Sequence, residues 1–232
     1  MIRSDQIRRL LLGTFVRPGS ETVDGEPRAE VVLGYLVPHP DGLLLFDTGI
    51  GVADPQTEAH YRPRRWPLPE ALAAAGAGLD DVDLLVNCHL HFDHCGGNPL
   101  LAGRPVFVQR VELDRARQPD YTVAALVDHA GVRHEVVDGE AEILPGVTVL
   151  PTPGHTAGHQ SLAVACSDGT VVLAGQAHDY ASDHSAADLA RLARRDGVAE
   201  PLPTPYGWMD RIAALEPRRV LFAHDPAAWE PA

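Results

Sequence analysis

The sequence contains few cysteines, few basic residues and no long apolar run. Its three cysteines, Cys88, Cys95 and Cys166, are an odd number and form no Cys-x-x-Cys pair, so we expect no disulfide framework. Only 19 Lys and Arg residues stand against 32 Asp and Glu residues, which gives a formal charge of −13. This charge argues against binding to nucleic acid, whose phosphates need a basic face, and against anionic membrane surfaces. No apolar run approaches about 18 residues, so no transmembrane helix is predicted.

What is present is typical of a globular protein. The chain has 232 residues, of which 45% are hydrophobic and 22% are charged, enough to bury a sizeable core. Gly and Pro are scattered throughout, without a repeat, a low-complexity tract or a linker. We therefore predict a single domain over residues 1–232. The first 15 residues lack a long hydrophobic segment and a small-residue cleavage site, so a cytoplasmic location is expected.

Short aliphatic and β-branched runs predict many strands. Most of these runs end at Gly, Pro or Asp, and they lie at 31–37, 43–46, 82–88, 106–108, 147–150, 162–165, 171–174 and 220–223. Helices are expected at 69–77, 110–116, 186–195 and 209–215. The first strands form hairpins and later ones alternate with helices. This order favours two β-rich halves, each flanked by helices, over one doubly wound parallel sheet.

The most informative stretch is His89-Leu90-His91-Phe92-Asp93-His94, which has the composition of a metal-ligand cluster. His89 and His91 are two residues apart and can face one ion, while Asp93 and His94 follow a turn and can face a second. Imidazole with carboxylate suits zinc, iron, manganese or cobalt, and zinc is the default expectation. The alternative is a solvated His-rich turn.

Further polar residues stand where apolar runs end. Asp47, His89, His155, Gln176 and His224 each follow a predicted strand. Side chains on loops at one end of a rigid sheet scaffold can converge on one site. We therefore expect these residues to meet.

Several longer stretches match a known family in order and spacing. They read LLFDTG at 44–49, CHLHFDHCGGN at 88–98, VFVQR at 106–110, LPGV at 144–147, TPGHTAGHQS at 152–161 and FAHD at 222–225. The chain resembles the metallo-β-lactamase-fold hydrolases, and within them most of all the N-acyl-homoserine lactonases, which open quorum-sensing lactones. The resemblance runs from about residue 30 to 226.

The resemblance implies a fold and a ligand set. The fold would be an α/β, four-layer αβ/βα sandwich with two zinc ions at one edge. The first ion would be held by His89, His91 and His155, and the second by Asp93, His94 and His224. Asp47 would accept a hydrogen bond from a ligand histidine, unless it is an ordinary turn aspartate. His159 is expected to be structural, and the five histidines without partners at ligand spacing are expected on the surface or in the core; they are His39, His60, His129, His134 and His184.

Two positions depart from the family pattern. Gln176 stands where the family has an aspartate that bridges both ions, and a neutral amide bridges poorly. Either Gln176 is a weak ligand or lies behind the ligands, or Asp179 or His178 takes over the bridging place. The family also has a tyrosine three residues after the bridging aspartate, which hydrogen-bonds the lactone carbonyl. Here Tyr180 comes one residue later, so it is either a catalytic residue or a partly buried surface tyrosine.

The chemistry expected of such a site is ester hydrolysis. Zinc lowers the pKa of a bound water to about 7, so hydroxide is available at neutral pH, and Asp93 would pass a proton to the leaving alkoxide. The substrate would be a small-molecule ester or lactone. Alternatives are a thioesterase, phosphodiesterase or β-lactamase of the same fold, and a non-catalytic module with one metal.

The substrate pocket is only partly visible in the sequence. Aromatic residues in the segments after Asp47 and after Asp179 are candidate pocket walls, and they are Tyr61, Trp66, Tyr206 and Trp208. Exposed aromatic residues also form dimer interfaces, so a homodimer is left open. Cys88 and Cys95 flank the histidine cluster and are expected to be small packing residues, with substrate contact as the alternative for Cys95.

Overall fold

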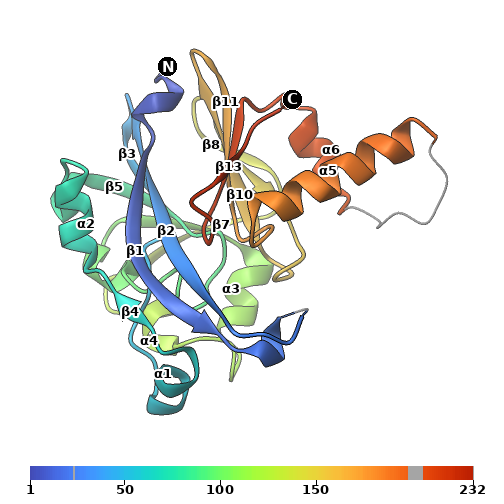
Figure 1. The fold of residues 1–232 in the computed structure, drawn as a ribbon. Helices are drawn as coiled ribbons and strands as arrows, with labels where there is room; N and C mark the ends of the chain where they lie inside the picture. Colours follow the sequence, from blue (N-terminus) through green and yellow to red (C-terminus); the bar gives the residue numbers. More distant parts are fainter. Residues whose placement is uncertain (23, 198–205, 232) are drawn as a thin grey trace.

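Two β-sheets pack face to face at the centre of the protein (Figure 1). The computed structural model describes residues 1–22, 24–197 and 206–231. The first sheet is seven-stranded with the order β4-β1-β2-β3-β5-β6-β7, and the second is six-stranded with the order β13-β12-β11-β10-β9-β8. The two β-rich halves predicted from the sequence are therefore confirmed.

The strands of the first sheet are β1 (Arg8–Arg17), β2 (Arg28–His39), β3 (Gly42–Phe46), β4 (Arg64–Arg65), β5 (Val82–Val86), β6 (Pro105–Gln109) and β7 (Arg133–Val137). Those of the second sheet are β8 (Ala141–Leu144), β9 (Val147–Pro151), β10 (Gln160–Cys166), β11 (Gly169–Gly175), β12 (Arg219–Phe222) and β13 (Ala228–Trp229). The helices are α1 (Pro55–Tyr61), α2 (Leu68–Ala74), α3 (Arg110–Ala116), α4 (Ala124–Val127), α5 (Ala181–Arg195) and α6 (Trp208–Ala213). Short 3₁₀ turns cover Ser4–Gln6, Gly19–Glu21, Leu79–Asp81 and Asn98–Leu101.

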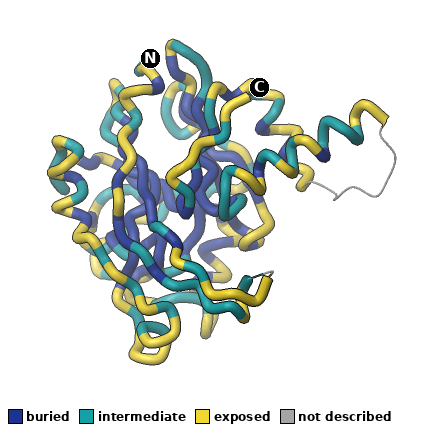
Figure 2. Tube along the Cα trace, in the orientation of Figure 1, coloured by how far each residue is buried: buried dark blue, intermediate teal, exposed yellow. Residues whose placement is uncertain are grey.

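Helices cover the outer face of each sheet, so the molecule has four layers. On the first sheet, Leu72 of α2 packs against Leu45 and Leu85. On the second, Met209 of α6 packs against Val172, and α5 runs alongside α6 on the same side (Figure 1). Figure 2 shows that the buried residues concentrate where the sheets face each other. The predicted αβ/βα sandwich is confirmed.

The burial of the central strands explains why their sequences are apolar. β3, β5 and β6 run parallel inside the first sheet, and strands of this kind are buried on both faces. Leu44 and Phe46 point into the core between the sheets, whereas Leu45 points toward α2. Successive residues thus pack against opposite layers. Because both layers are apolar, the whole strand has to be apolar.

Some elements lie outside the predicted runs. β1 pairs with β2 over most of its length, but a bulge between Leu11 and Gly13 interrupts its alternation. β7 and β8 carry many polar residues because they lie at the edges of their sheets. β5 ends at Val86, two residues earlier than predicted, because the chain there turns into the histidine loop.

No helix among the described residues combines the length and the hydropathy needed to cross a membrane.

Candidate metal centre

The histidine loop is fixed to the loop that follows β3. The backbone N–H of Thr48 donates to the carbonyl of His94 at 2.8 Å, and that of Gly96 donates to Gly49 at 2.7 Å. A Cβ atom at Gly96 would lie 1.9 Å from the backbone nitrogen of Gly51, so only glycine allows this approach. The two loops therefore act as one rigid support at the carboxyl ends of β3 and β5.

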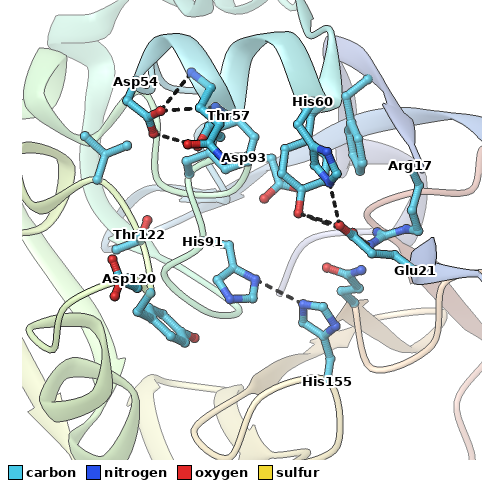
Figure 3. Close-up of a pocket in the computed structure, with 17 residues that line it drawn as sticks. Arg17, Glu21, Asp54, Thr57, His60, His91, Asp93, Asp120, Thr122 and His155 are labelled. Carbon is cyan, nitrogen blue, oxygen red and sulfur yellow. Dashed lines mark hydrogen bonds and ion pairs between the residues drawn. The ribbon is translucent and has the colours of Figure 1, made fainter. Parts of the chain in front are cut away.

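Three histidines form a first cluster. His89 Nε2 lies 2.9 Å from His91 Nδ1, which lies 3.2 Å from His155 Nε2. His89 is fully buried, and His155 comes from the loop after β9. Figure 3 shows His91 and His155 pointing toward one another at the floor of a cavity. The structure thus brings together the three residues predicted to hold the first ion.

A second cluster lies next to the first. His94 Nε2 is 3.2 Å from His224 Nε2, and the Asp93 carboxylate is 3.4 Å from His94 and 3.6 Å from His224. His224 arrives from the loop after β12, on the other sheet. The ring centroids of His89 and His94 are 4.2 Å apart, so the two clusters are adjacent. The residues predicted for the second ion are therefore also together.

Fixed hydrogen bonds orient the rings. Asp47 Oδ2 lies 3.0 Å from His94 Nδ1, and the carbonyl of Val31 lies 2.8 Å from His224 Nδ1. Each bond places a proton on Nδ1 and leaves Nε2 facing the cluster. Asp47 has a left-handed backbone with φ of 61°, a costly conformation for a non-glycine residue that is often found at functional sites. It turns the end of β3 so that the carboxylate reaches His94, as the sequence predicted.

Cys88 contacts both clusters. Its Sγ lies 3.2 Å from His89 Nδ1 and 3.3 Å from His94 Nδ1. Burial, together with the Asp47 carboxylate, raises the pKa of the thiol to about 12, so it is neutral at ordinary pH. Cys88 was expected only to pack, yet it touches two candidate ligands. Cys95 is fully buried, and its Sγ donates to the carbonyl of Leu90 at 3.5 Å.

The buried environment keeps most of these imidazoles neutral. Burial, reinforced by His91 and His94, lowers the pKa of His155 to about 3. Burial and the neighbouring His94 also lower the pKa values of His89 and His224. Neutral imidazole has a free lone pair, which is the form that binds a metal ion.

His94 behaves differently. Burial lowers its pKa, but the carboxylates of Asp93 and Asp47 outweigh burial and raise it well above the usual value. A cation is thus favoured at this position, either as a proton or as a metal ion. Binding of a metal ion at Nε2 has to displace that proton.

The two clusters fit divalent metal ions. Two nitrogens that bind one tetrahedral zinc at 2.0–2.1 Å lie roughly 3.3 Å apart. The separations of 2.9, 3.2, 3.4 and 3.6 Å within the clusters are close to this value. The donor atoms are imidazole nitrogens and a carboxylate oxygen, which are typical zinc ligands.

Gln176 lies at the predicted position but is tied to a neighbour. Its side chain is 3% exposed and lines the cavity, and its Nε2 donates to Asp179 Oδ1 at 3.0 Å. Asp179 in turn forms an ion pair with Arg28 at 2.6 Å. His178 faces His184 at 3.3 Å. Among the described residues, neither Asp179 nor His178 belongs to a group of converging metal-ligand atoms.

Tyr180 is not among the residues that line the cavity. It precedes α5, and its ring packs under the Arg28 guanidinium at 4.9 Å. Its catalytic contact with a lactone stays a prediction. Of the predicted pocket walls, Tyr61 lines the cavity and Trp66 does not. Tyr206 and Trp208 stack on each other at 5.3 Å, also away from it.

The cavity above the clusters has a volume of ≈ 750 Å³. Phe15, Tyr61, Phe92, Tyr121 and Val123 supply its apolar surface. Its outer wall is polar, and Figure 3 shows the acidic side chains around it. These are Glu21, Asp54 and Asp120, all exposed.

One cation also lines this cavity, but it is already paired. Arg17 makes a bidentate ion pair with buried Glu30, at 2.6 and 2.7 Å. Arg17 Nη1 lies farther from the Glu21 carboxylate, at 3.8 Å. Since Glu30 compensates Arg17, the wall carries an excess of negative charge.

Two residues of the cavity were not predicted from the sequence to line it. His60, expected on the surface or in the core, lines the wall and lies 2.9 Å from Glu21. Tyr121 stacks on His91 with ring centroids 4.6 Å apart. Neither carries a local signal, because each reaches the cavity only through the packing of α1 or of the loop before α4.

His159 has the structural contacts that were predicted. Its Nδ1 lies 2.8 Å from Thr152 Oγ1, and its Nε2 accepts the backbone N–H of Gln176 at 3.0 Å. Both ring nitrogens are therefore occupied, and the ring connects the loop of His155 with the end of β11.

A comparison with protein families shows which family this chain belongs to. The model described as the metallo-beta-lactamase superfamily matches residues 28–224. The chain belongs to the metallo-beta-lactamase superfamily. This fold implies binding of a divalent metal ion, and both histidine clusters lie inside or at the boundary of the matched region.

Curated relatives of this metallo-beta-lactamase superfamily chain are lactonases. It is 31% identical over 152 residues to an N-acyl homoserine lactonase of Bacillus thuringiensis, covering 60% of each chain. The match therefore spans about three fifths of that relative's length. It is also 26% identical over 230 residues to the N-acyl homoserine lactonase AttM of Rhizobium johnstonii, covering 84% of this chain and 82% of the relative.

Solved structures share the superfamily fold. A structure of a quorum-quenching N-acyl homoserine lactone hydrolase is 25% identical, with a TM-score of 0.71 and coverage of 95% and 92% of the two chains. Another, with the product N-hexanoyl-L-homoserine bound at its catalytic metal centre, is 23% identical with a TM-score of 0.71, covering 95% and 93%.

Proposed function

We propose that this protein is a metal-dependent hydrolase that opens the lactone ring of N-acyl-homoserine lactones or related lactones. One observation carries the proposal: six side chains bring their ligand atoms into two adjacent clusters at the floor of one cavity. They are His89, His91 and His155 in one, and Asp93, His94 and His224 in the other. The lactonase relatives support the choice of substrate. We propose zinc as the metal, and the whole chain as one hydrolase domain.

The metal ions, Asp93 and the cavity wall would each have a separate role in the reaction. Bound zinc would polarise the lactone carbonyl and lower the pKa of water. Asp93 lines the cavity and lies beside both histidines of the second cluster. It would accept the proton of the attacking water and return it to the ring oxygen as the acyl carbon–oxygen bond breaks. The apolar side chains of the wall would exclude water from the acyl group.

The charge of the cavity wall supports a neutral substrate. Glu21, Asp54 and Asp120 surround the approach to the clusters, and Arg17 is compensated by Glu30. A phosphodiester or a β-lactam carboxylate would approach like charge, whereas a lactone is uncharged. The hydroxy acid formed by ring opening is anionic, so the same wall would favour its release.

We predict that the purified protein hydrolyses neutral lactones in preference to anionic esters. The kcat/KM for an N-acyl-homoserine lactone should exceed that for a phosphodiester or a carboxylate-bearing β-lactam by about 10²-fold or more, since facing like charges cost several kcal/mol. The measurement is a panel of lactone, thioester, phosphodiester and β-lactam substrates with the metal fully loaded. Faster hydrolysis of any other panel member than of lactones would replace the proposed substrate class.

The charge of residue 176 should determine how tightly the second metal ion binds. We expect Gln176→Asp to tighten binding of that ion about tenfold or more, because a carboxylate adds negative charge to the cavity that Gln176 and Asp93 both line. Stepwise zinc titration by calorimetry would measure both affinities. Gln176→Asn, which keeps an amide, is the matched control. Unchanged affinity in the aspartate variant would show that residue 176 does not reach the ions.

The cytoplasmic location, the homodimer and the catalytic role of Tyr180 stay predictions.

A further inference from the structure

Glu112 is a buried carboxylate outside both clusters. It lies in the first turn of α3 and is 1% exposed. Its Oε1 accepts the backbone N–H of Leu90 at 2.8 Å and the hydroxyl of Tyr121, and its Oε2 accepts the hydroxyl of Thr156 at 2.8 Å. Within the described residues, no arginine lies at ion-pairing distance from it. Burying an unpaired charge is costly, so three donors at one carboxylate call for an explanation.

Each of these donors adjoins a histidine of the first cluster. Leu90 is the residue between His89 and His91, and Thr156 follows His155 directly. Tyr121 stacks on the ring of His91. One carboxylate therefore holds the immediate neighbours of all three rings, which come from loops more than 60 residues apart in the chain.

The loop of His155 also packs on the backbone of Glu112. A Cβ atom at Gly158 would lie 2.3 Å from the backbone nitrogen of Glu112, so the absence of a side chain permits this contact. Burial and the Glu112 carboxylate raise the pKa of Tyr121 far above its usual value, so its hydroxyl remains a donor. The start of α3 and the loop of His155 are thus fixed to each other.

The second cluster is held by different groups. Asp47 orients His94, and the carbonyl of Val31 orients His224. Neither of them contacts Glu112. A change at Glu112 should therefore alter the metal affinity of the first cluster and leave that of the second unchanged.

We propose that Glu112 is the positioning residue of the first metal site, fixing the loops of His91 and His155 in binding geometry before the ion arrives. The inference rests on the metal centre of the proposed function. Outer groups that orient ligand histidines typically contribute 10- to 100-fold to metal affinity. Glu112 differs from them in bonding to the neighbours of the ligands instead of to the rings.

The experiment uses two single-site proteins. His224→Ala removes a ligand of the second cluster, so its tightest zinc ion reports the first site, and His155→Ala does the reverse. Adding Glu112→Ala should weaken zinc binding about 10- to 100-fold in the His224→Ala protein and leave it nearly unchanged in the His155→Ala protein. Affinities would be measured by competition with a chelator. The visible spectrum of the Co²⁺-loaded protein should change only in the first case.

Two further variants separate positioning from general damage. Glu112→Gln keeps an oxygen for Leu90, and its amide can donate to Thr156 Oγ1, so it should recover much of the affinity. Asp114→Ala removes an exposed carboxylate from the same helix and should change neither affinity. If Glu112→Ala fails to fold, as judged by circular dichroism, Thr156→Val removes one of the same bonds and takes its place.

The proposal is overturned if Glu112→Ala binds zinc as tightly as Asp114→Ala in the His224→Ala protein. Equal losses in both single-site proteins would also overturn it, as would a glutamine variant as weak as the alanine one. A wild-type protein that binds two ions without opening any lactone would refute the proposed function only. The zinc affinities would still decide the role of Glu112.

Discussion

Replacing His91 with alanine is expected to reduce lactone opening by about 10³-fold or more, because water without a bound zinc has a pKa of about 15.7 instead of about 7. His91 Nδ1 lies between the other two nitrogens of its cluster, 2.9 Å from His89 and 3.2 Å from His155. Its loss leaves two nitrogens where a zinc site needs at least three protein ligands. Treatment of the wild type with a chelator should have the same effect.

The measurement pairs hydrolysis rates with metal content. Zinc added back after chelation should restore the wild-type rate but not that of His91→Ala. His129→Ala is the matched control, since His129 lies outside both clusters and its ring contacts the carbonyl of Ala130 at 3.2 Å. A His91→Ala protein that opens lactones at the wild-type rate would exclude the first cluster from the reaction.

Asp93→Asn is expected to lower kcat by about 10²- to 10⁴-fold, the usual contribution of a positioned acid or base. Burial raises the pKa of Asp93, but His94 and His224 outweigh burial and hold it well below the usual range. The carboxylate is therefore ionised at neutral pH, which is the form that a proton acceptor needs at the start of the reaction. Asparagine has nearly the same shape and no such capacity.

Steady-state kinetics would test the role of Asp93. KM should change little while kcat falls, provided that metal content is matched, because the substrate can still occupy the cavity. Asp120→Asn neutralises another carboxylate of the same cavity and should leave kcat close to that of the wild type. If Asp93→Asn retains most of its kcat at full metal loading, another group handles the proton.

Much of the fold was predictable because the central strands are buried on both faces. β3 and β11 appear in the sequence as apolar runs, and their ends coincide with Asp47 and Gln176. β1 escaped prediction because its exposed and buried residues alternate around a bulge. Edge strands and short helices depend on what packs beside them, and a local pattern does not contain that information.

The candidate site also contains some residues that could be predicted from the sequence and others that could not. The spacing of His89, His91, Asp93 and His94 requires these residues to share one loop, so their grouping could be predicted. Tyr121 could not be found, because it reaches His91 through a loop whose course depends on α3 and α4. The sequence left Tyr180 open between a catalytic residue and a surface tyrosine, and the packing of its ring against Arg28 could not be read from a local pattern.

By itself, the sequence determined which side chains can bind metal and at which strand ends they stand, because residue type and strand period are local properties. The tertiary structure alone decided the partners that depend on distant segments. It joined His224 to Val31 across 193 positions of the chain, tied Gln176 to Asp179 and placed Glu112 behind the first cluster. Such contacts follow from how two sheets and their loops pack, and packing sums many weak interactions that no short stretch of sequence specifies.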